Sequence, residues 1–263
     1  MTEKVTVITG ASSGIGEALA KHLGAKGHRL VLGARRENEL KRVAGGIGSN
    51  AIPVRTDVTR RKDVEHLRDV ALERFGHVDV WVNNAGRGIT KSVMELTDQE
   101  FDEIVAVVLK SVFYGMQTIV PHFQERGRGH LINVSSFLGR VPLISYRSIY
   151  SAMKSAVNVL TANLRVDLKA KYPGIHVSTV MPGVVDTDFQ KVAGSPFPVR
   201  AGSTLGPQRV QSADEVAVQI VSLIDHPVAE LYTNPAAPEL AQQYFRDVAL
   251  FEESMLRRRS SGN

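Results

Sequence analysis

Lys4-Val-Thr-Val-Ile-Thr9-Gly10-Ala-Ser-Ser-Gly14-Ile-Gly16 is the stretch that decides the fold. Its first half is β-branched and apolar, as in a buried strand, and the residues after Gly16 favour a helix. The glycines between them allow the backbone to approach a pyrophosphate, and the start of a helix offers free N–H groups. The pattern predicts the first unit of a dinucleotide-binding fold, although its Gly-x3-Gly-x-Gly spacing differs from the generic fingerprint.

Strand-like and helix-like segments alternate along the rest of the chain, which is typical of a parallel sheet with helices on both faces. We expect further strands at residues 28–34, 51–54, 78–83, 130–135, 175–181 and 230–233, and long helices near 98–126 and 148–172. No repeat or linker divides the 263 residues, of which 43% are apolar, so one domain is expected. The predicted fold is α/β, a Rossmann-type doubly wound parallel sheet of about seven strands.

Tyr150 and Lys154 stand four residues apart in Tyr-Ser-Ala-Met-Lys, so on a helix they share one face. One cation about 4 Å from a phenol contributes on the order of 4 kcal/mol at an effective dielectric near 20. We therefore expect Lys154 to lower the pKa of Tyr150 into the working range of a general acid or base. The pair alone is a weak pattern, because a solvated pair or a packing tyrosine gives the same letters.

Five motifs, taken together, resemble the short-chain dehydrogenase/reductase family, in its compact single-domain branch. In chain order they are Thr9 to Gly16, Asn83-Asn84-Ala85-Gly86, Asn133-Val-Ser135-Ser136, Tyr150 to Lys154, and Pro182-Gly183 with Thr187. The resemblance covers residues 4 to 233. It implies that a nicotinamide cofactor carries hydride while Tyr150 moves a proton to or from the substrate oxygen. It also implies that Ser136 hydrogen-bonds that oxygen and that Lys154 contacts the nicotinamide ribose; Ser135 is the competing serine.

The same resemblance implies which residues line the cofactor cleft. They are Gly10, Ser12, Ser13, Gly14, Ile15, Gly16, Arg35, Arg36, Asp57, Val58, Asn84, Ala85, Gly86, Tyr150, Lys154, Pro182, Gly183, Val185 and Thr187.

The end of the second predicted strand indicates the cofactor. An acidic residue about 20 positions past the glycine turn usually holds the ribose hydroxyls of NAD, but this chain has Gly33-Ala34-Arg35-Arg36. A guanidinium binds a 2′-phosphate through paired hydrogen bonds. We therefore expect NADP(H), with Arg35 as the main contact. The alternative is that both arginines face solvent at the start of a helix.

One position departs from the family pattern. Relatives carry an asparagine in the middle of the long fourth helix, where this chain has Val108. Valine has no hydrogen-bonding side chain, so a proton relay through this position would lose a partner. The departure keeps open a nucleotide-binding sensor or scaffold without turnover. An epimerase or dehydratase of the larger, nucleotide-sugar branch fits the glycine spacing and short C-terminal region less well.

The substrate is indicated less clearly. We expect residues 188–212, with Phe197, Val199 and Leu205, to close over the site and favour a hydrophobic ketone, aldehyde or alcohol. Arg87, Arg140, Arg147 and Arg200 leave an anionic substrate open.

A C-terminal helix is predicted over residues 238–258. It carries an apolar stripe for packing on the body or on a second copy, made of Leu240, Tyr244, Val248, Phe251 and Met255. The resemblance implies a homodimer or homotetramer.

Composition and charge argue against nucleic-acid binding, a membrane span and a metal site. The net charge of +5 is dispersed apart from short basic runs, so nucleic-acid binding is not expected. Lys110 interrupts the longest apolar run, so no membrane span is expected. A strand this close to Met1 leaves no room for a signal peptide, which favours the cytoplasm. The chain has no cysteine, and its eight histidines lack ligand-like spacing, so no metal site is expected.

Overall fold

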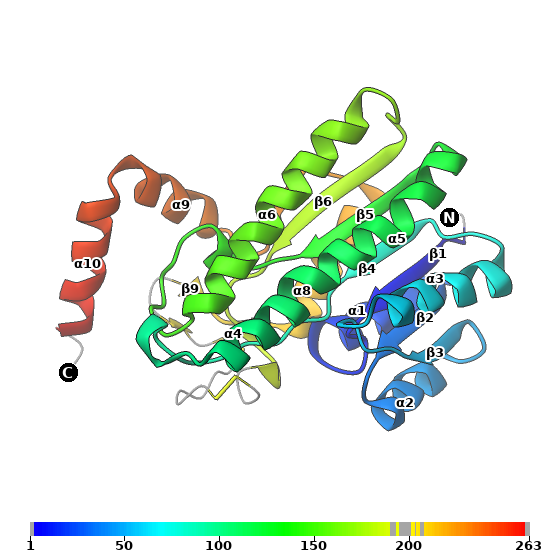
Figure 1. The fold of residues 1–263 in the computed structure, drawn as a ribbon, viewed down its shortest axis with the longest axis horizontal. Helices are drawn as coiled ribbons and strands as arrows, with labels where there is room; N and C mark the ends of the chain where they lie inside the picture. The colour runs from blue at the N-terminus through cyan, green and yellow to red at the C-terminus, as the bar shows by residue number, and fades with distance from the viewer. Residues whose placement is uncertain (1–2, 190–192, 195–200, 203, 206–207, 261–263) are drawn as a thin grey trace.

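A seven-stranded parallel sheet forms the centre of the computed structural model, which describes residues 3–189, 193–194, 201–202, 204–205 and 208–260 (Figure 1). The strand order is β11-β6-β5-β4-β1-β2-β3, which confirms the predicted doubly wound fold. The first strand lies at the centre, with Thr6 paired to both Leu30 and Val80. The strands are β1 (Val5–Thr9), β2 (Arg29–Ala34), β3 (Ala51–Arg55), β4 (Val80–Asn83), β5 (Gly129–Val134), β6 (Ile175–Met181) and β11 (Glu230–Tyr232).

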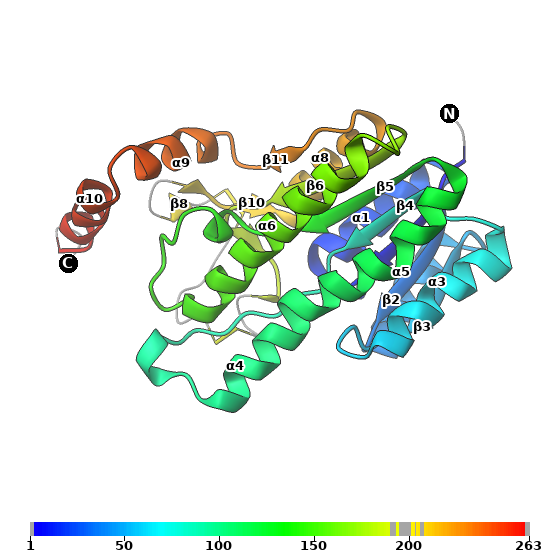
Figure 2. The ribbon, with the colours of Figure 1, turned by 45° about the horizontal axis from the view of Figure 1, so that its top comes forward.

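Helices cover both faces of the sheet (Figure 2). One face carries α1 (Gly14–Ala25), α2 (Glu37–Ile47) and α8 (Ala213–Asp225), and the other carries α3 (Arg61–Phe75), α5 (Ser111–Arg126) and α6 (Ser148–Lys169). Successive residues of β1 point to opposite faces of the sheet. Ile8 packs in the core beneath α1, α2 and α8, and Val7 packs in the core beneath α3, α5 and α6. Both are fully buried, as expected for a strand covered on both faces.

The predicted helix over residues 98–126 contains an internal change of winding. It comprises α4 (Asp98–Ile104), a π-helical segment η2 (Val105–Lys110) and α5. The whole segment is long and apolar enough to cross a membrane by length and composition, but half of its most apolar window is buried inside the protein. Packing of α5 on β4 and β5 accounts for this apolar character.

The predicted C-terminal helix is two helices, α9 (Ala237–Arg246) and α10 (Val248–Ser260). The break falls at Asp247, whose backbone is extended and whose side-chain Oδ1 accepts a hydrogen bond from Leu250 N at 3.0 Å. Leu240, Tyr244 and Phe251 pack against a small core with Phe137. The end of α10 extends away from the sheet (Figure 1).

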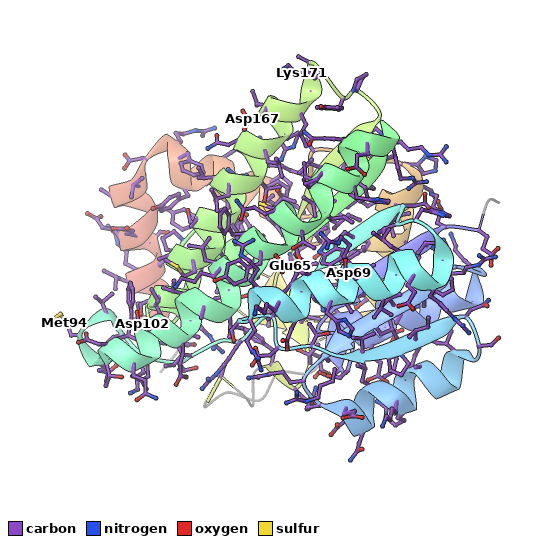
Figure 3. All side chains as sticks on the ribbon, turned by 45° about the vertical axis from the view of Figure 1, so that its right-hand side comes forward. Glu65, Asp69, Met94, Asp102, Asp167 and Lys171 are labelled. Carbon is purple, nitrogen blue, oxygen red and sulfur yellow. The ribbon has the colours of Figure 1, made fainter. Side chains whose placement is uncertain are left out.

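Short elements complete the chain. They are η1 (Val93–Glu95), η3 (Phe137–Gly139), β7 (Val185–Asp186), β8 (Thr204–Leu205), β9 (Gln208–Arg209) and β10 (Gln211–Ser212). The outer surfaces of the helices are charged: Asp69 on α3, Asp102 on α4 and Asp167 on α6 point away from the body (Figure 3).

Candidate active site

A cavity of about 780 Å³ lies along the carboxyl edge of the sheet. Every residue that the sequence predicted for the site lines this cavity, except Gly16. The carboxyl ends of parallel strands meet at one edge, which is why segments as far apart in the sequence as Gly10 and Thr187 come together there. Within the described ranges, no group of three or more histidine, aspartate or glutamate residues is placed to hold a metal ion.

The glycine-rich turn forms one end of the cavity. Gly10 and Gly14 have φ angles of 69° and 56°, in the left-handed region that favours glycine. Helix α1 starts at Gly14, so its unpaired N–H groups and positive dipole end lie at the wall. Gly16 is buried behind that wall, where a Cβ would lie 2.4 Å from Gly10 O. The absence of a Cβ at Gly16 therefore lets the helix pack on the turn, and its predicted contact with the cofactor stays a prediction.

Asn84 holds the glycine-rich turn in place. Its Nδ2 donates to Thr9 O at 2.9 Å, and the hydroxyl of Thr9 accepts from the backbone N–H groups of Asn84 and Ala85 at 3.0 and 3.1 Å. The strand end after β4 is thus fastened directly to the strand end after β1. Asn84, which the sequence predicted to line the cofactor cleft, therefore supports the wall of the cavity and also forms part of its surface.

The two arginines after β2 occupy different positions. Arg36 Nη2 donates to the hydroxyls of both Ser12 and Ser13, which connects it to the glycine-rich turn. Arg35 lies near Asp57: burial raises the pKa of that carboxyl, but hydrogen bonds from Thr59 and the charge of Arg35 outweigh burial and lower it. Both guanidinium groups line the cavity, so this end of it carries two positive charges.

Ser136 and Tyr150 both line the cavity. Ser136 acts to lower the pKa of the Tyr150 phenol, and Ser136 Oγ accepts a hydrogen bond from Leu138 N at 3.1 Å. Ser135, the competing serine, donates its hydroxyl proton to Lys154 O at 3.0 Å and so anchors α6. Gly139 packs on the same helix, because a Cβ there would lie 2.6 Å from the Lys154 carbonyl carbon.

The electrostatics of Tyr150 differ from the expectation. Burial raises the pKa of Tyr150 to about 12, against the lowering effects of the Ser136 hydrogen bond and the charge of Arg147. Lys154 Nζ donates to Val134 O at 2.7 Å and lies 5.7 Å from the centre of the Tyr150 ring. Burial also lowers the pKa of Lys154 to about 8. The helical spacing predicted their shared face correctly but not where the ammonium points.

Val108 lies in the π-helical segment and is completely buried. It belongs to an apolar cluster with Ile104, Ile149 and Tyr150. Val108 is not among the residues that line the cavity, so its side chain belongs to the apolar packing around Tyr150.

Two cavity residues carry chemistry or shape that the sequence did not reveal. Phe189, just after β7, lies with its ring centre 5.3 Å from that of Tyr150, and Gly88 leaves room for it, since a Cβ there would approach the ring to 2.6 Å. Met255 of α10 also reaches the wall. Of the predicted substrate segment 188–212, Phe197 and Val199 lie outside the described residues, as does the side chain of Leu205. In the sequence, the predicted apolar stripe that includes Met255 was a feature that could have indicated that the C-terminal helix reaches the cavity.

The comparisons with known proteins agree with this geometry. Residues 4–196 match the family model for short chain dehydrogenases. An uncharacterised oxidoreductase of Staphylococcus epidermidis is 31% identical over 225 residues, which cover 86% of this chain and 92% of the relative.

Two solved structures are similar over nearly the whole chain. A short chain dehydrogenase/reductase of Burkholderia phymatum in complex with NAD has a TM-score of 0.84 and 29% identity, covering 94% of this chain and 95% of that one. An alcohol dehydrogenase from the archaeon Thermococcus sibiricus, complexed with 5-hydroxy-NADP, has a TM-score of 0.77 and 32% identity, covering 90% and 98%. The chain belongs to the short-chain dehydrogenase/reductase family of NAD(P)-dependent oxidoreductases.

Proposed function

We propose that this protein is an NADP(H)-dependent reductase of hydrophobic ketones or aldehydes, which also oxidises the corresponding alcohols. The observation that carries the proposal is that one cavity is lined both by Ser136 with Tyr150 and by Arg35 with Arg36. The first pair suits a carbonyl oxygen, and the second suits a phosphate.

The choice of NADP(H) rests on the two arginines. Among the similar structures, one holds NAD and another an NADP derivative, so the fold accommodates both. Among the residues that the structure describes, no acidic side chain forms an ion pair with Arg35 or Arg36, and the charge of Arg35 acts to lower the pKa of Asp57. The bound dinucleotide supplies or accepts hydride at the substrate carbon. The glycine-rich turn, with no Cβ atoms at Gly10 and Gly14, leaves room for its pyrophosphate.

The state of Tyr150 favours the reductive direction. With a pKa near 12 the phenol is protonated at neutral pH, so it is ready to donate to the alkoxide that forms on the substrate. Ser136 lines the same cavity and acts to lower the pKa of this phenol, and its proposed role is to orient the same substrate oxygen. An alkoxide is a stronger base than a phenolate, so the transfer runs downhill even from a weakly acidic tyrosine.

The expected substrate is largely apolar around its carbonyl group. Leu138 and Phe189 pack against Tyr150. The apolar side chains that line the cavity include these two and Val107, Leu143, Ile144 and Met255. Such a wall favours burial of hydrocarbon, at roughly 25 cal/mol per Å² of apolar surface.

The active form is proposed to be a homodimer or homotetramer. Exposed apolar side chains on α5 and α6 support this: Phe113 is 38% exposed, Val159 56% and Val166 72%. Light scattering after size exclusion would report the mass directly, and a monomer would contradict the assembly without affecting the chemistry.

Cofactor titration followed by turnover tests the proposal. NADPH and NADH binding would be measured by fluorescence, and oxidation of each would be followed with a panel of hydrophobic ketones, diketones and aldehydes. We expect tighter binding of NADPH and its consumption by at least one apolar carbonyl. NADPH binding without consumption across the panel would instead support the sensor or scaffold function.

A further inference from the structure

The last helix of the chain contributes a side chain to the cavity. Among the described residues after β11, Met255 of α10 is the one that lines it. This helix lies beyond residue 196, where the match to the family model ends. The presence of Met255 at the site is therefore explained by the contacts of this chain and not by the family motifs.

Helix α9 is anchored on residues 137–143, which follow the candidate catalytic serine. Ala237 and Ala241 of α9 are buried and pack in one apolar cluster with Phe137. Leu143 packs against this cluster and also lines the cavity. The small alanine side chains let the helix lie close to the segment, so α9 is fixed relative to one wall of the cavity.

The bend at Asp247 holds α10 against the same cluster. Phe251 N donates to Asp247 O at 3.1 Å and Leu250 N donates to Asp247 Oδ1 at 3.0 Å, so this extended residue caps the new helix. Across the bend, the ring of Phe251 meets the ring of Tyr244 edge-on, with 5.5 Å between their centres. Phe251 also packs against the cluster around Phe137, so the first turn of α10 is fixed on the body of the protein.

The direction of α10 brings Met255 to the cavity. Met255 stands four residues after Phe251, and residues four apart share one face of a helix. The face that carries Phe251 packs beside Leu143, which lines the cavity next to Ile144 in the chain. Met255 therefore approaches the wall formed between the candidate catalytic serine and tyrosine, which is not the glycine-rich turn.

A methionine suits a wall that meets hydrocarbon. Its unbranched thioether side chain is flexible and polarisable, so it adapts to apolar groups of irregular shape. Met255 is half-buried, and its replacement changes the space at the wall without removing a side-chain hydrogen bond.

We propose that Met255 is a specificity-determining residue that limits the chain length of the substrate. The proposal rests on the proposed reductase function. When the carbonyl group is held at Tyr150, a hydrocarbon chain that extends along Leu143 and Ile144 ends against the side chain of Met255. Shorter chains leave part of the cavity unfilled, and longer chains must displace α10.

A homologous series of straight-chain methyl ketones measures this limit. With NADPH, kcat/KM should rise by about fourfold for each methylene that the cavity buries, and then stop rising at a definite length. Met255→Ala should move that length upward by about two carbon atoms, and Met255→Trp should move it downward by about as much. The matched controls are Leu250→Ala and Leu250→Trp, because Leu250 lies on the same helix, is 62% exposed and does not line the cavity. They should leave the limit unmoved.

A second readout does not depend on turnover. The chain has no cysteine, so Met255→Cys introduces a single thiol whose labelling by a maleimide can be followed. With NADP⁺ present, decyl methyl ketone at about ten times its Kd should slow the labelling by about tenfold, because the thiol is covered when the cavity is filled. Acetone should not slow it, and Leu250→Cys should be labelled at the same rate with either ketone.

Protection of Met255→Cys by the long ketone supports the proposal even if no carbonyl compound is reduced, in which case the proposed function fails separately. Absence of that protection would overturn the proposal. So would full protection by NADP⁺ alone, which would place Met255 against the cofactor. A length limit that is unmoved in both Met255→Ala and Met255→Trp, or moved equally by the Leu250 variants, would also overturn it.

Discussion

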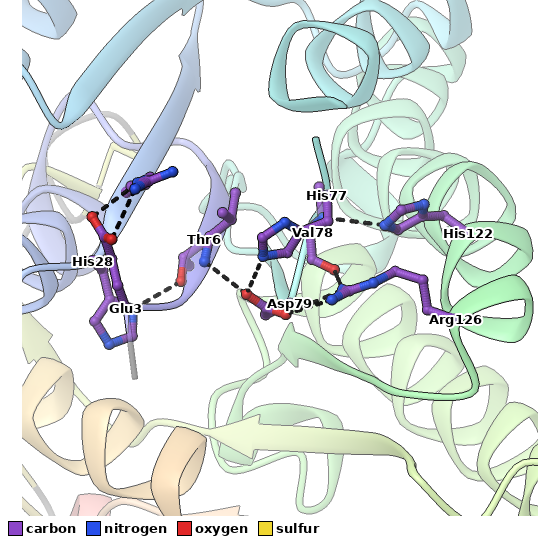
Figure 4. A network of polar contacts seen from close by, with 10 residues as sticks. Glu3, Thr6, His28, His77, Val78, Asp79, His122 and Arg126 are labelled. Atoms are coloured by element: carbon purple, nitrogen blue, oxygen red, sulfur yellow. Dashed lines mark hydrogen bonds and ion pairs between the residues drawn. The ribbon is translucent and has the colours of Figure 1, made fainter. Parts of the chain in front are cut away.

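The two edges of the parallel sheet both gather polar side chains, and they treat charge in opposite ways. At the amino edge, Asp79 accepts hydrogen bonds from Val5 N at 2.9 Å, from His77 at 3.1 Å and from Arg126 at 3.1 Å (Figure 4). Burial raises the pKa of Asp79, but these partners outweigh it and hold the pKa below its ordinary value. The charged form is the stable one there.

At the carboxyl edge burial prevails. It raises the pKa of Tyr150 and lowers that of Lys154, so both side chains are pushed toward their neutral forms. The amino edge also closes its contacts within the chain, as in the bond from Val78 N to His122 Nε2 at 3.1 Å (Figure 4). The carboxyl edge leaves its groups along an open cavity. The comparison teaches that a charge held by hydrogen bonds at the amino edge supports folding, whereas the buried neutral phenol of Tyr150 at the carboxyl edge is the group proposed to transfer a proton.

The largest expected effect is the loss of the phenol itself. Tyr150→Phe removes the proton donor while keeping the ring that packs on Phe189. Turnover should fall by about 10²–10⁴-fold, the usual contribution of a general acid. Unfolding in urea should be unchanged within about 0.5 kcal/mol. Consumption of NADPH at the rate of the parent protein would contradict the role of Tyr150 as proton donor, and with it the functional contrast between the two edges.

Asp79→Asn should lower the stability and leave turnover nearly unchanged, the reverse of the result expected for Tyr150→Phe. Loss of the partly buried charge leaves Arg126 without its carboxylate, so the free energy of unfolding should fall by about 2–3 kcal/mol. The kcat of the folded variant should stay close to that of the parent. The measurement is a urea midpoint beside a turnover assay, and a large loss of turnover in fully folded protein would contradict a purely structural role.

The pH dependence of that stability sharpens the test. Because the folded pKa of Asp79 is lowered, its contribution is fully present above the unfolded value of about 3.9 and is lost as the pH falls through the folded value. The difference between parent and Asp79→Asn should therefore be complete at neutral pH and shrink below about pH 4. Urea unfolding at several pH values measures it, and a gap that stays constant into acid would refute the assignment.

The arginines at the far end of the cavity give a smaller effect. Arg35→Asp should weaken NADPH binding by about 10–100-fold, since a charge-assisted hydrogen bond contributes about 1.5–3 kcal/mol. NADH binding should change far less. Arg36→Ala serves as the paired variant, because it removes the link to Ser12 and Ser13 and should disturb both cofactors. Equal losses for both cofactors in Arg35→Asp would refute NADP(H) selectivity.

Val108→Asn should have the smallest effect. It places an amide among apolar side chains, so we expect the free energy of unfolding to fall by about 1–2 kcal/mol. Turnover should not rise above that of the parent. A substantial gain in kcat, measured at saturating substrate, would show that a proton relay limits turnover and that Val108 slows the reaction.

The sequence predicted most of the fold because two strong signals coincide. The buried β-branched runs, such as the one at Ile175–Met181, were located to the residue or nearly so, and the glycine-rich turn was correctly placed between the first strand and the first helix. The break at Asp247 was missed because the apolar stripe continues in register across it. The π-helical segment was missed because a single continuous apolar run carries no mark of its winding.

The sequence predicted which residues line the site better than it predicted their pKa values and side-chain orientations. Helical spacing puts Tyr150 and Lys154 on one face, but only the packed structure shows the ammonium turned to Val134 O. Arg147 carried no motif, and its burial depends on Phe189, which comes from a segment forty-two positions later in the numbering. Burial of a charge is set by tertiary packing, so no local pattern reveals it.

The central place of β1 has a consequence during synthesis. Its pairing with β2 is available once residue 34 has left the ribosome, but its other edge waits for β4, which ends at Asn83. Until then the nascent chain exposes one unpaired edge of a β-branched strand, the kind of edge that invites aggregation. Chaperone demand should therefore peak while the second quarter of the polypeptide is being translated.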